Sequence, residues 1–264
     1  MEDTTAAAEA RYTFGDGDTA ARRLELLARA FEPSSRELLG AAVPQPPGLA
    51  LDLGCGPGLS TAVVAGATRA ARTVGLDRSE AFLDAARRAF PTLEFVRHDV
   101  ATTAFPTPPP DLVFARLVLA HLPDPAGLAR RWAGGLAPGG RLVLEEMEWI
   151  EAADPVLADY EARVLAVVED QGAPMYAGPL LRHLDGHDGE QRSWTEVRTI
   201  TVPASVAARI YGLNLETWRH DRFAREHFRR RDLDRLAARL ARLAADADGR
   251  VEWGVRQLVV ERRA

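Results

Sequence analysis

The stretch Leu49-Ala-Leu-Asp-Leu-Gly-Cys-Gly-Pro-Gly-Leu-Ser60 decides the fold of this chain. Its apolar run, Leu49 to Leu53, is long enough for one buried strand and ends at three glycines separated by single residues. The residues from Ser60 to Ala67 are predicted to form a helix whose first amide hydrogens point back over the glycines. Because glycine lacks a Cβ atom, a ligand can approach the backbone of such a loop closely. The pattern therefore predicts a strand, a ligand-binding loop and a helix.

The spacing of the glycines narrows the class of ligand. A dinucleotide-binding loop reads G-x-G-x-x-G and would place its third glycine where this chain has Leu59. A triphosphate-binding loop needs the Lys and Ser/Thr of G-x-x-x-x-G-K-[ST], which are absent here. The spacing thus argues against NAD and against a nucleoside triphosphate, and a glycine turn without any ligand is the alternative.

The run L-D-L-G-C-G-P-G, from Leu51 to Gly58, resembles motif I of the class I S-adenosylmethionine (SAM)-dependent methyltransferases. The resemblance implies an α/β fold: a Rossmann-like, doubly wound and mostly parallel seven-stranded sheet, with an N-terminal helical segment and a helical lid inserted after the fifth strand. It implies SAM as cofactor and S-adenosylhomocysteine (SAH) as product. In the loop itself, it assigns to the cofactor site Asp52, Gly54, Cys55, Gly56 and Gly58.

Strand and helix patterns alternate from Leu49 to Glu148, as is typical of a parallel sheet with crossover helices. The second strand ends at Asp77, about 20 residues after the glycines, where a carboxylate can bind a ribose diol. Under the resemblance, further cofactor contacts fall after the second, third and fourth strands: Arg78 after the second, Asp99 and Val100 at the adenine amino group and ring, and Arg116 and His121 near the SAM amino group. The later strands are predicted at 141–147, 192–202 and 251–261, with helices at 128–136 and between 204 and 245.

The segment from residue 12 to residue 40 precedes the first strand and has apolar residues at helical intervals. In methyltransferases that this chain resembles, such a helix lies across the cofactor cleft. Tyr12 and Arg23 are then expected to reach the methionine end of SAM, because an Arg fork suits its carboxylate. A solvated Arg on an amphipathic helix is the alternative.

Catalysis needs little from the protein, because the methyl group of SAM is already electrophilic. A base is required only for a protonated acceptor, and a carboxylate acceptor requires none. Three acids, Glu145, Glu146 and Glu148, lie where the fifth strand ends, with Glu146 and Glu148 on one face. The candidate catalytic residues are His121, Glu146 and Glu148, and the candidate acceptor-binding residues are Glu146, Trp149 and Tyr176. Alternatively, the acids form a solvated strand end and His121 is a structural partner beneath the cofactor.

Composition restricts the possible partners. The 264 residues carry a formal net charge of −5 and include 1 cysteine, so neither an internal disulfide nor a thiolate cluster can form. The histidines lack the spacing of metal ligands, and no metal is predicted. The basic run from Arg219 to Arg242 is interrupted by acids, which favours solvated helices over nucleic-acid binding. We expect a cytoplasmic monomer or homodimer, without a secretory leader or a membrane span of ~18 apolar residues.

The predicted function is transfer of a methyl group from SAM to an O, N or C atom of a small molecule, with secondary metabolism as one setting. A SAM-binding enzyme that promotes a cyclisation or rearrangement is one alternative, and a non-catalytic SAM-binding regulatory protein is another.

The predicted organisation is an N-terminal helical cap segment at 1–48, a SAM-binding core at 49–150, a helical lid at 151–190 and the C-terminal part of the sheet, with inserted helices, at 191–264.

Overall fold

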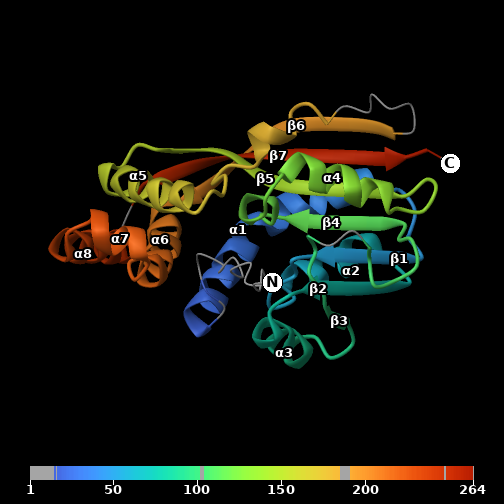
Figure 1. Ribbon diagram of the computed structural model, residues 1–264, viewed down its shortest axis with the longest axis horizontal. Helices are drawn as coiled ribbons and strands as arrows, with labels where there is room; N and C mark the ends of the chain where they lie inside the picture. Colours follow the sequence, from blue (N-terminus) through green and yellow to red (C-terminus); the bar gives the residue numbers. More distant parts are fainter. Residues whose placement is uncertain (1–14, 16, 102–103, 185–190, 247, 264) are drawn as a thin grey trace, which may run out of the picture.

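The computed structural model describes residues 15, 17–101, 104–184, 191–246 and 248–263. Its sheet has seven strands in the order β3-β2-β1-β4-β5-β7-β6, and β7 is antiparallel to both of its neighbours (Figure 1). The other neighbouring strands run parallel. The predicted seven-stranded, mostly parallel sheet is therefore confirmed. The strands are β1 (Leu49–Leu53), β2 (Arg72–Asp77), β3 (Glu94–Arg97), β4 (Leu112–Arg116), β5 (Arg141–Ala152), β6 (Gln191–Pro203) and β7 (Arg250–Arg262).

Helices cover both faces of the sheet, because the buried strands are apolar on both sides. Ala50, Phe114 and Val143 pack on α1 and α2, whereas Leu51, Val113 and Leu144 pack on the opposite face with α4. The described helices are α1 (Asp18–Ala42), α2 (Leu59–Thr68), α3 (Glu80–Ala89), α4 (Pro125–Gly134), α5 (Pro155–Asp170), α6 (Ala204–Trp218), α7 (Arg222–His227), α8 (Arg230–Asp246) and the short 3₁₀ helices η1 (Leu119–His121) and η2 (Gly178–Leu181).

The helices α5 to α8, here called the helical cap, form a lobe beside the sheet, and α1 lies between this lobe and the sheet (Figure 1). The cap is held by a core of large aromatic residues, in which the rings of Tyr160 and Tyr211 stack with centroids 4.2 Å apart. The core also includes Trp253 of β7. The cap thus packs directly on the long β5–β7–β6 part of the sheet.

Two elements differ from the sequence-based expectation. The predicted fifth strand ends at Met147, but β5 continues to Ala152 because it pairs with β7, past a shift in register between Met147 and Trp149. The helix predicted at residues 128–136 begins earlier, at Pro125. The side chain of Asp124 accepts a hydrogen bond from Gly127 N at 3.0 Å, and proline suits the first helical position because its φ is already fixed.

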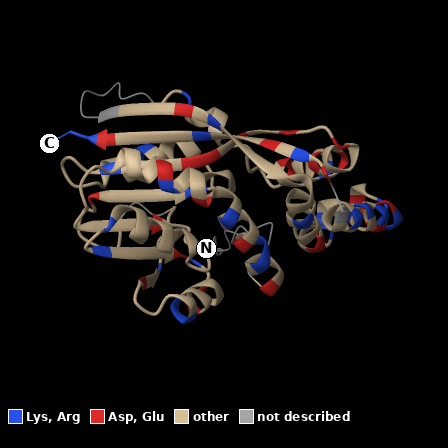
Figure 2. Ribbon diagram, turned by 180° about the vertical axis from the view of Figure 1, so that it is seen from behind, with Lys and Arg blue, Asp and Glu red and all other residues tan. Residues whose placement is uncertain are grey.

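None of the described helices is long and apolar enough to cross a membrane. The basic run of the sequence lies on α7 and α8, where acidic and basic residues are intermixed (Figure 2). Arg219 pairs with Asp234, and Arg235 lies 3.6 Å from Asp232. The intermixed charges fit the interpretation of α8 as a solvated helix, and the absence of a nucleic-acid partner stays a prediction.

Candidate functional site

The glycine loop, residues 54–58, connects β1 to α2 at the carboxyl end of the sheet. All three of its glycines have positive φ, and two of them are also enclosed by side chains. A Cβ atom on Gly54 would lie 2.7 Å from Val118 Cγ2, and one on Gly58 would lie 2.9 Å from the ring of Phe95. These glycines are therefore needed both for the backbone conformation and for packing on neighbouring elements.

Asp52 holds together the two elements that the glycine loop connects. Its Oδ2 accepts hydrogen bonds from Ser60 Oγ and Thr61 Oγ1, both at 2.7 Å, so it ties the end of β1 to the first turn of α2. Burial raises the pKa of Asp52 to about 6 against the effect of these hydroxyls. Cys55 is buried beside Gly75, and burial raises the pKa of its thiol well above the ordinary value. Cys55 is thus a small neutral filler of the space beside Gly75, and its role at the cofactor site stays a prediction.

Asp77 connects the loop to the next strand. Its Oδ2 accepts a hydrogen bond from Gly56 N at 2.9 Å, and its Oδ1 accepts one from Ser79 N at 2.8 Å. Because a carboxylate offers about four acceptor positions, these two bonds leave room for the hydroxyls of a ribose. Burial raises the pKa of Asp77, while the two amides oppose that rise.

The tip of β3 lies next to the tip of β2, since Asp77 and Arg97 are register partners. Asp99 is exposed at this tip, and its Oδ1 accepts a hydrogen bond from Ala101 N at 2.9 Å. Val100 is held from the other side, where its carbonyl accepts from Trp132 Nε1 at 2.9 Å. The structure therefore brings the predicted ribose and adenine residues to one edge, with the exposed Arg78 between them in the chain. Tyr12 lies outside the described residues.

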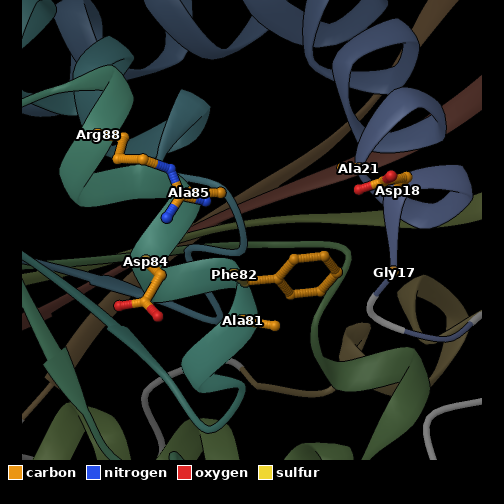
Figure 3. A pocket seen from close by; sticks show the side chains of 8 residues that line it. All are labelled: Gly17, Asp18, Ala21, Ala81, Phe82, Asp84, Ala85 and Arg88. Carbon is orange, nitrogen blue, oxygen red and sulfur yellow. The ribbon is translucent and has the colours of Figure 1, made fainter.

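A pocket of about 280 Å³ lies between the first turn of α1 and the side of α3 that faces it. The ring of Phe82 points across it toward Gly17, and the charged side chains of Asp18, Asp84 and Arg88 also belong to its lining (Figure 3). None of the residues predicted for the cofactor lines this pocket, so it is distinct from the predicted site. Its lining consists of Gly17, Asp18, Ala21, Ala81, Phe82, Asp84, Ala85 and Arg88.

The turn after β4 carries the remaining cofactor candidates. Arg116 lies over the ring of Phe31 and donates a hydrogen bond to Ser35 Oγ at 3.0 Å. His121 ends η1, and burial lowers its pKa to about 3, an effect strengthened by the charges of Arg23 and Arg78. His121 is therefore neutral at neutral pH and too weak a base to take a proton efficiently there.

The three acids at the end of β5 are buried, so they do not form a solvated strand end. Burial acts to raise the pKa of Glu148, but the hydrogen bonds and charges of Arg256 and Arg182 outweigh it and lower the pKa. Glu146 is fully enclosed, and burial raises its pKa to about 7. The carboxylate of Glu145 accepts hydrogen bonds from Ser34 and Ser35 of α1 and from Gln257 of β7. Each acid is thus engaged with the protein itself.

Arg23 is buried where α1 meets the cap, so the interpretation as a solvated Arg is wrong. Its Nη1 donates a hydrogen bond to Asn214 Oδ1 of α6 at 3.2 Å. Among the acceptor-binding candidates, the hydroxyl of Tyr176 donates to Glu161. Trp149 packs on β7, where only a glycine fits opposite it. The roles of these three candidates stay predictions.

Several residues of this region are not singled out by the sequence patterns: Ser34, Ser35, Asn214 and Gln257. One signal in the sequence could have indicated two of them. Pro33-Ser34-Ser35 interrupts an otherwise helical segment, and proline and serine are unfavourable inside a helix. The burial of Ser34 and Ser35 against Glu145 explains why serines stand at these two positions. No group of three or more possible metal ligands exists among the residues that the structure describes.

Comparisons with known proteins agree with this geometry. Residues 51–144 match the family described as Methyltransferase domain. A trans-aconitate 2-methyltransferase of Methylobacterium radiotolerans is 48% identical over 109 residues, which are 41% of this chain and 42% of that protein. One of Rhizobium meliloti is 35% identical over 150 residues, which are 56% of this chain and 55% of that protein. The matches therefore span only about half of these relatives or less.

The fold extends beyond the matched segment. The plantazolicin methyltransferase BpumL, in a structure in complex with SAH, superposes with a TM-score of 0.56 over 97% of this chain and 94% of that one. At 13% identity, this likeness concerns the fold alone. With the glycine loop, the strand order and the family match in agreement, residues 51–144 are a methyltransferase domain of the class I, SAM-dependent family.

Proposed function

We propose that the chain transfers a methyl group from SAM to a small molecule, and that the acceptor atom is a carboxylate oxygen. The observation that carries the cofactor assignment is the contact of Asp77 with Gly56. It fixes an acidic group beside the open backbone of the glycine loop, at the edge of the sheet where ligands of such folds bind.

The chain's own residues have defined tasks in this proposal. SAM supplies an electrophilic methyl group, so the protein has to bind, orient and exclude water. Asp77 binds the ribose hydroxyls, and Asp99 and the Val100 amide bind the adenine ring. Arg23 provides a buried positive charge for the carboxylate at the methionine end of SAM. Positioning of this kind can contribute ~7–11 kcal/mol to lowering the barrier.

The choice of a carboxylate acceptor follows from the three candidate bases. His121 has a pKa of about 3, Glu148 is held by two arginines, and Glu146 is enclosed. None of the three is suited to take a proton from a hydroxyl or an ammonium group. A carboxylate is already ionised at neutral pH and needs no base. Two relatives are named for trans-aconitate, which is itself a carboxylate, and this supports the same choice.

Two measurements test the proposal. Calorimetric titration of the wild-type protein with SAH is expected to show binding, and its absence would refute the cofactor assignment. Turnover with SAM is then measured on a matched panel of carboxylic acids, phenols and amines, with release of SAH as the readout. Release with carboxylic acids alone is expected, whereas release only with phenols or amines would contradict the choice of acceptor.

A further inference from the structure

The carboxylate of Glu146 lies beneath the turn that follows β4. Its Oε1 accepts hydrogen bonds from the backbone N–H groups of Val118 and Leu119, both at 2.8 Å. Its Oε2 is sealed from solvent and has no hydrogen-bond partner among the described residues. A proton on an acceptor molecule cannot reach this carboxylate, because Oε1 is occupied and Oε2 is covered.

The turn that Glu146 supports has an unfavourable backbone. Leu117 has a φ of 57°, in the left-handed region that side chains with a Cβ atom disfavour. Leu117 N donates to the carbonyl of Glu145 at 2.9 Å, which continues the pairing of β4 with β5. The next two amides have no strand to pair with, and both are taken by Glu146. The acid therefore satisfies the backbone groups that this turn leaves over.

The same turn touches the glycine loop. A Cβ atom on Gly54 would lie 2.7 Å from Val118 Cγ2, so Val118 fills the space beside the first glycine. At its other end, the turn continues into η1 and ends at His121. A shift of the turn would therefore displace both the surroundings of Gly54 and the position of His121.

We infer that Glu146 is a positioning residue: by holding the amides of Val118 and Leu119, it keeps Val118 against Gly54 and so shapes the cofactor site. The inference rests on the proposed function for the identity of the ligand, SAH. It goes beyond that function because it assigns to Glu146 the support of the turn. A role as general base would instead require contact between Glu146 and the acceptor.

Two substitutions with opposite expected effects separate these roles. Glu146→Gln keeps an oxygen acceptor at the same reach, whereas Glu146→Asp keeps the ionisable carboxylate but shortens it by one methylene. For a positioning residue, E146Q binds SAH within about threefold of wild type, and E146D binds at least ~10-fold more weakly, as expected for the loss of about 1.4 kcal/mol of hydrogen bonding. A general base gives the reverse order in kcat, with E146D more active than E146Q.

Hydrogen exchange of the peptide containing residues 117–121 provides a readout independent of the ligand. Exchange is expected to be faster in E146D than in E146Q, with E151Q, an exposed acid on the same strand, as the matched control and circular dichroism as the check of folding. Equal exchange in E146D and wild type would overturn the inference, as would loss of kcat in E146Q with unchanged SAH affinity. If the wild type bound no SAH, the proposed function would fail, while the exchange measurement would still decide the role of Glu146.

Discussion

The carboxylate of Asp77 joins the end of β2, the glycine loop and the start of α3 through two backbone amides. A neutral alanine at this position would remove both hydrogen bonds and the acceptor oxygens expected to meet the ribose. Loss of the bond to Gly56 N and loss of the ribose contact are both expected to weaken cofactor binding.

Asp77→Ala is therefore expected to weaken SAH binding at least ~10-fold, which corresponds to about 1.4 kcal/mol. Asp84→Ala is the matched control, since Asp84 is an exposed acid on α3 and is expected to leave SAH affinity within about twofold. Calorimetric titration of both variants measures the difference. An unchanged affinity in D77A would show that the ribose is held elsewhere.

At the scale of elements, the ion pair of Glu148 with Arg256 joins β5 to β7. Both side chains are buried, and the two donors of Arg256 lie 2.7 and 2.9 Å from the carboxylate oxygens. Arg182, which follows η2, contacts the same carboxylate from its more exposed side. Glu148 lies within the register shift between Met147 and Trp149, where the pairing of β5 with β7 changes.

Arg256→Ala is expected to lower the free energy of unfolding by about 3 kcal/mol, because the charge of Glu148 then stays buried with a single partner. Arg72→Ala is a suitable comparison, since the Arg72–Glu94 pair joins two strands at the surface, where solvent screens the attraction, and its loss is expected to be much smaller. Urea denaturation of both variants provides the measurement. Equal losses in the two variants would contradict the importance of burial.

At the scale of the whole molecule, two buried acids make stability depend on pH. Burial raises the pKa of Asp52 from 3.8 to about 6 and that of Glu146 from 4.5 to about 7. Between the unfolded and the folded pKa values, the folded state binds more protons than the unfolded state. Their contribution to stability is therefore fully present below about pH 4 and is lost as the pH rises through about 7.

Between pH 5 and pH 7.5, the Glu146 contribution alone is expected to change by about 2 kcal/mol. Glu146→Gln removes this ionisation, so over this range the unfolding free energy of E146Q is expected to lose about 2 kcal/mol less than that of wild type, since the other titrating groups, including His121 with its lowered pKa, are common to both. Chemical denaturation at the two pH values measures both slopes, and Glu151→Gln is expected to keep the wild-type slope. Parallel curves for E146Q and wild type would rule out the raised pKa.

The glycine loop and the strands β1, β2 and β4 are predictable from local patterns, because each of these strands has an apolar stretch that ends at a glycine, an aspartate or a turn. Asp52 and Asp77 were found in this way. The contacts of Glu145 and Glu148 were not, since their partners Gln257 and Arg256 come more than 100 residues later and on a strand whose place in the sheet depends on tertiary structure. For the same reason, β5 was predicted to end too early.

The position of β7 also determines the order in which the molecule can be completed during synthesis. β7 is inserted between β5 and β6, although it follows every other described element along the chain. Until residues 250–262 emerge from the ribosome, β5 is an open edge, β6 has no partner strand, and Glu145 and Glu148 lack their donors on β7. A nascent chain that stops before β7 is therefore a target for proteases and for aggregation, even though its entire glycine loop has already been made.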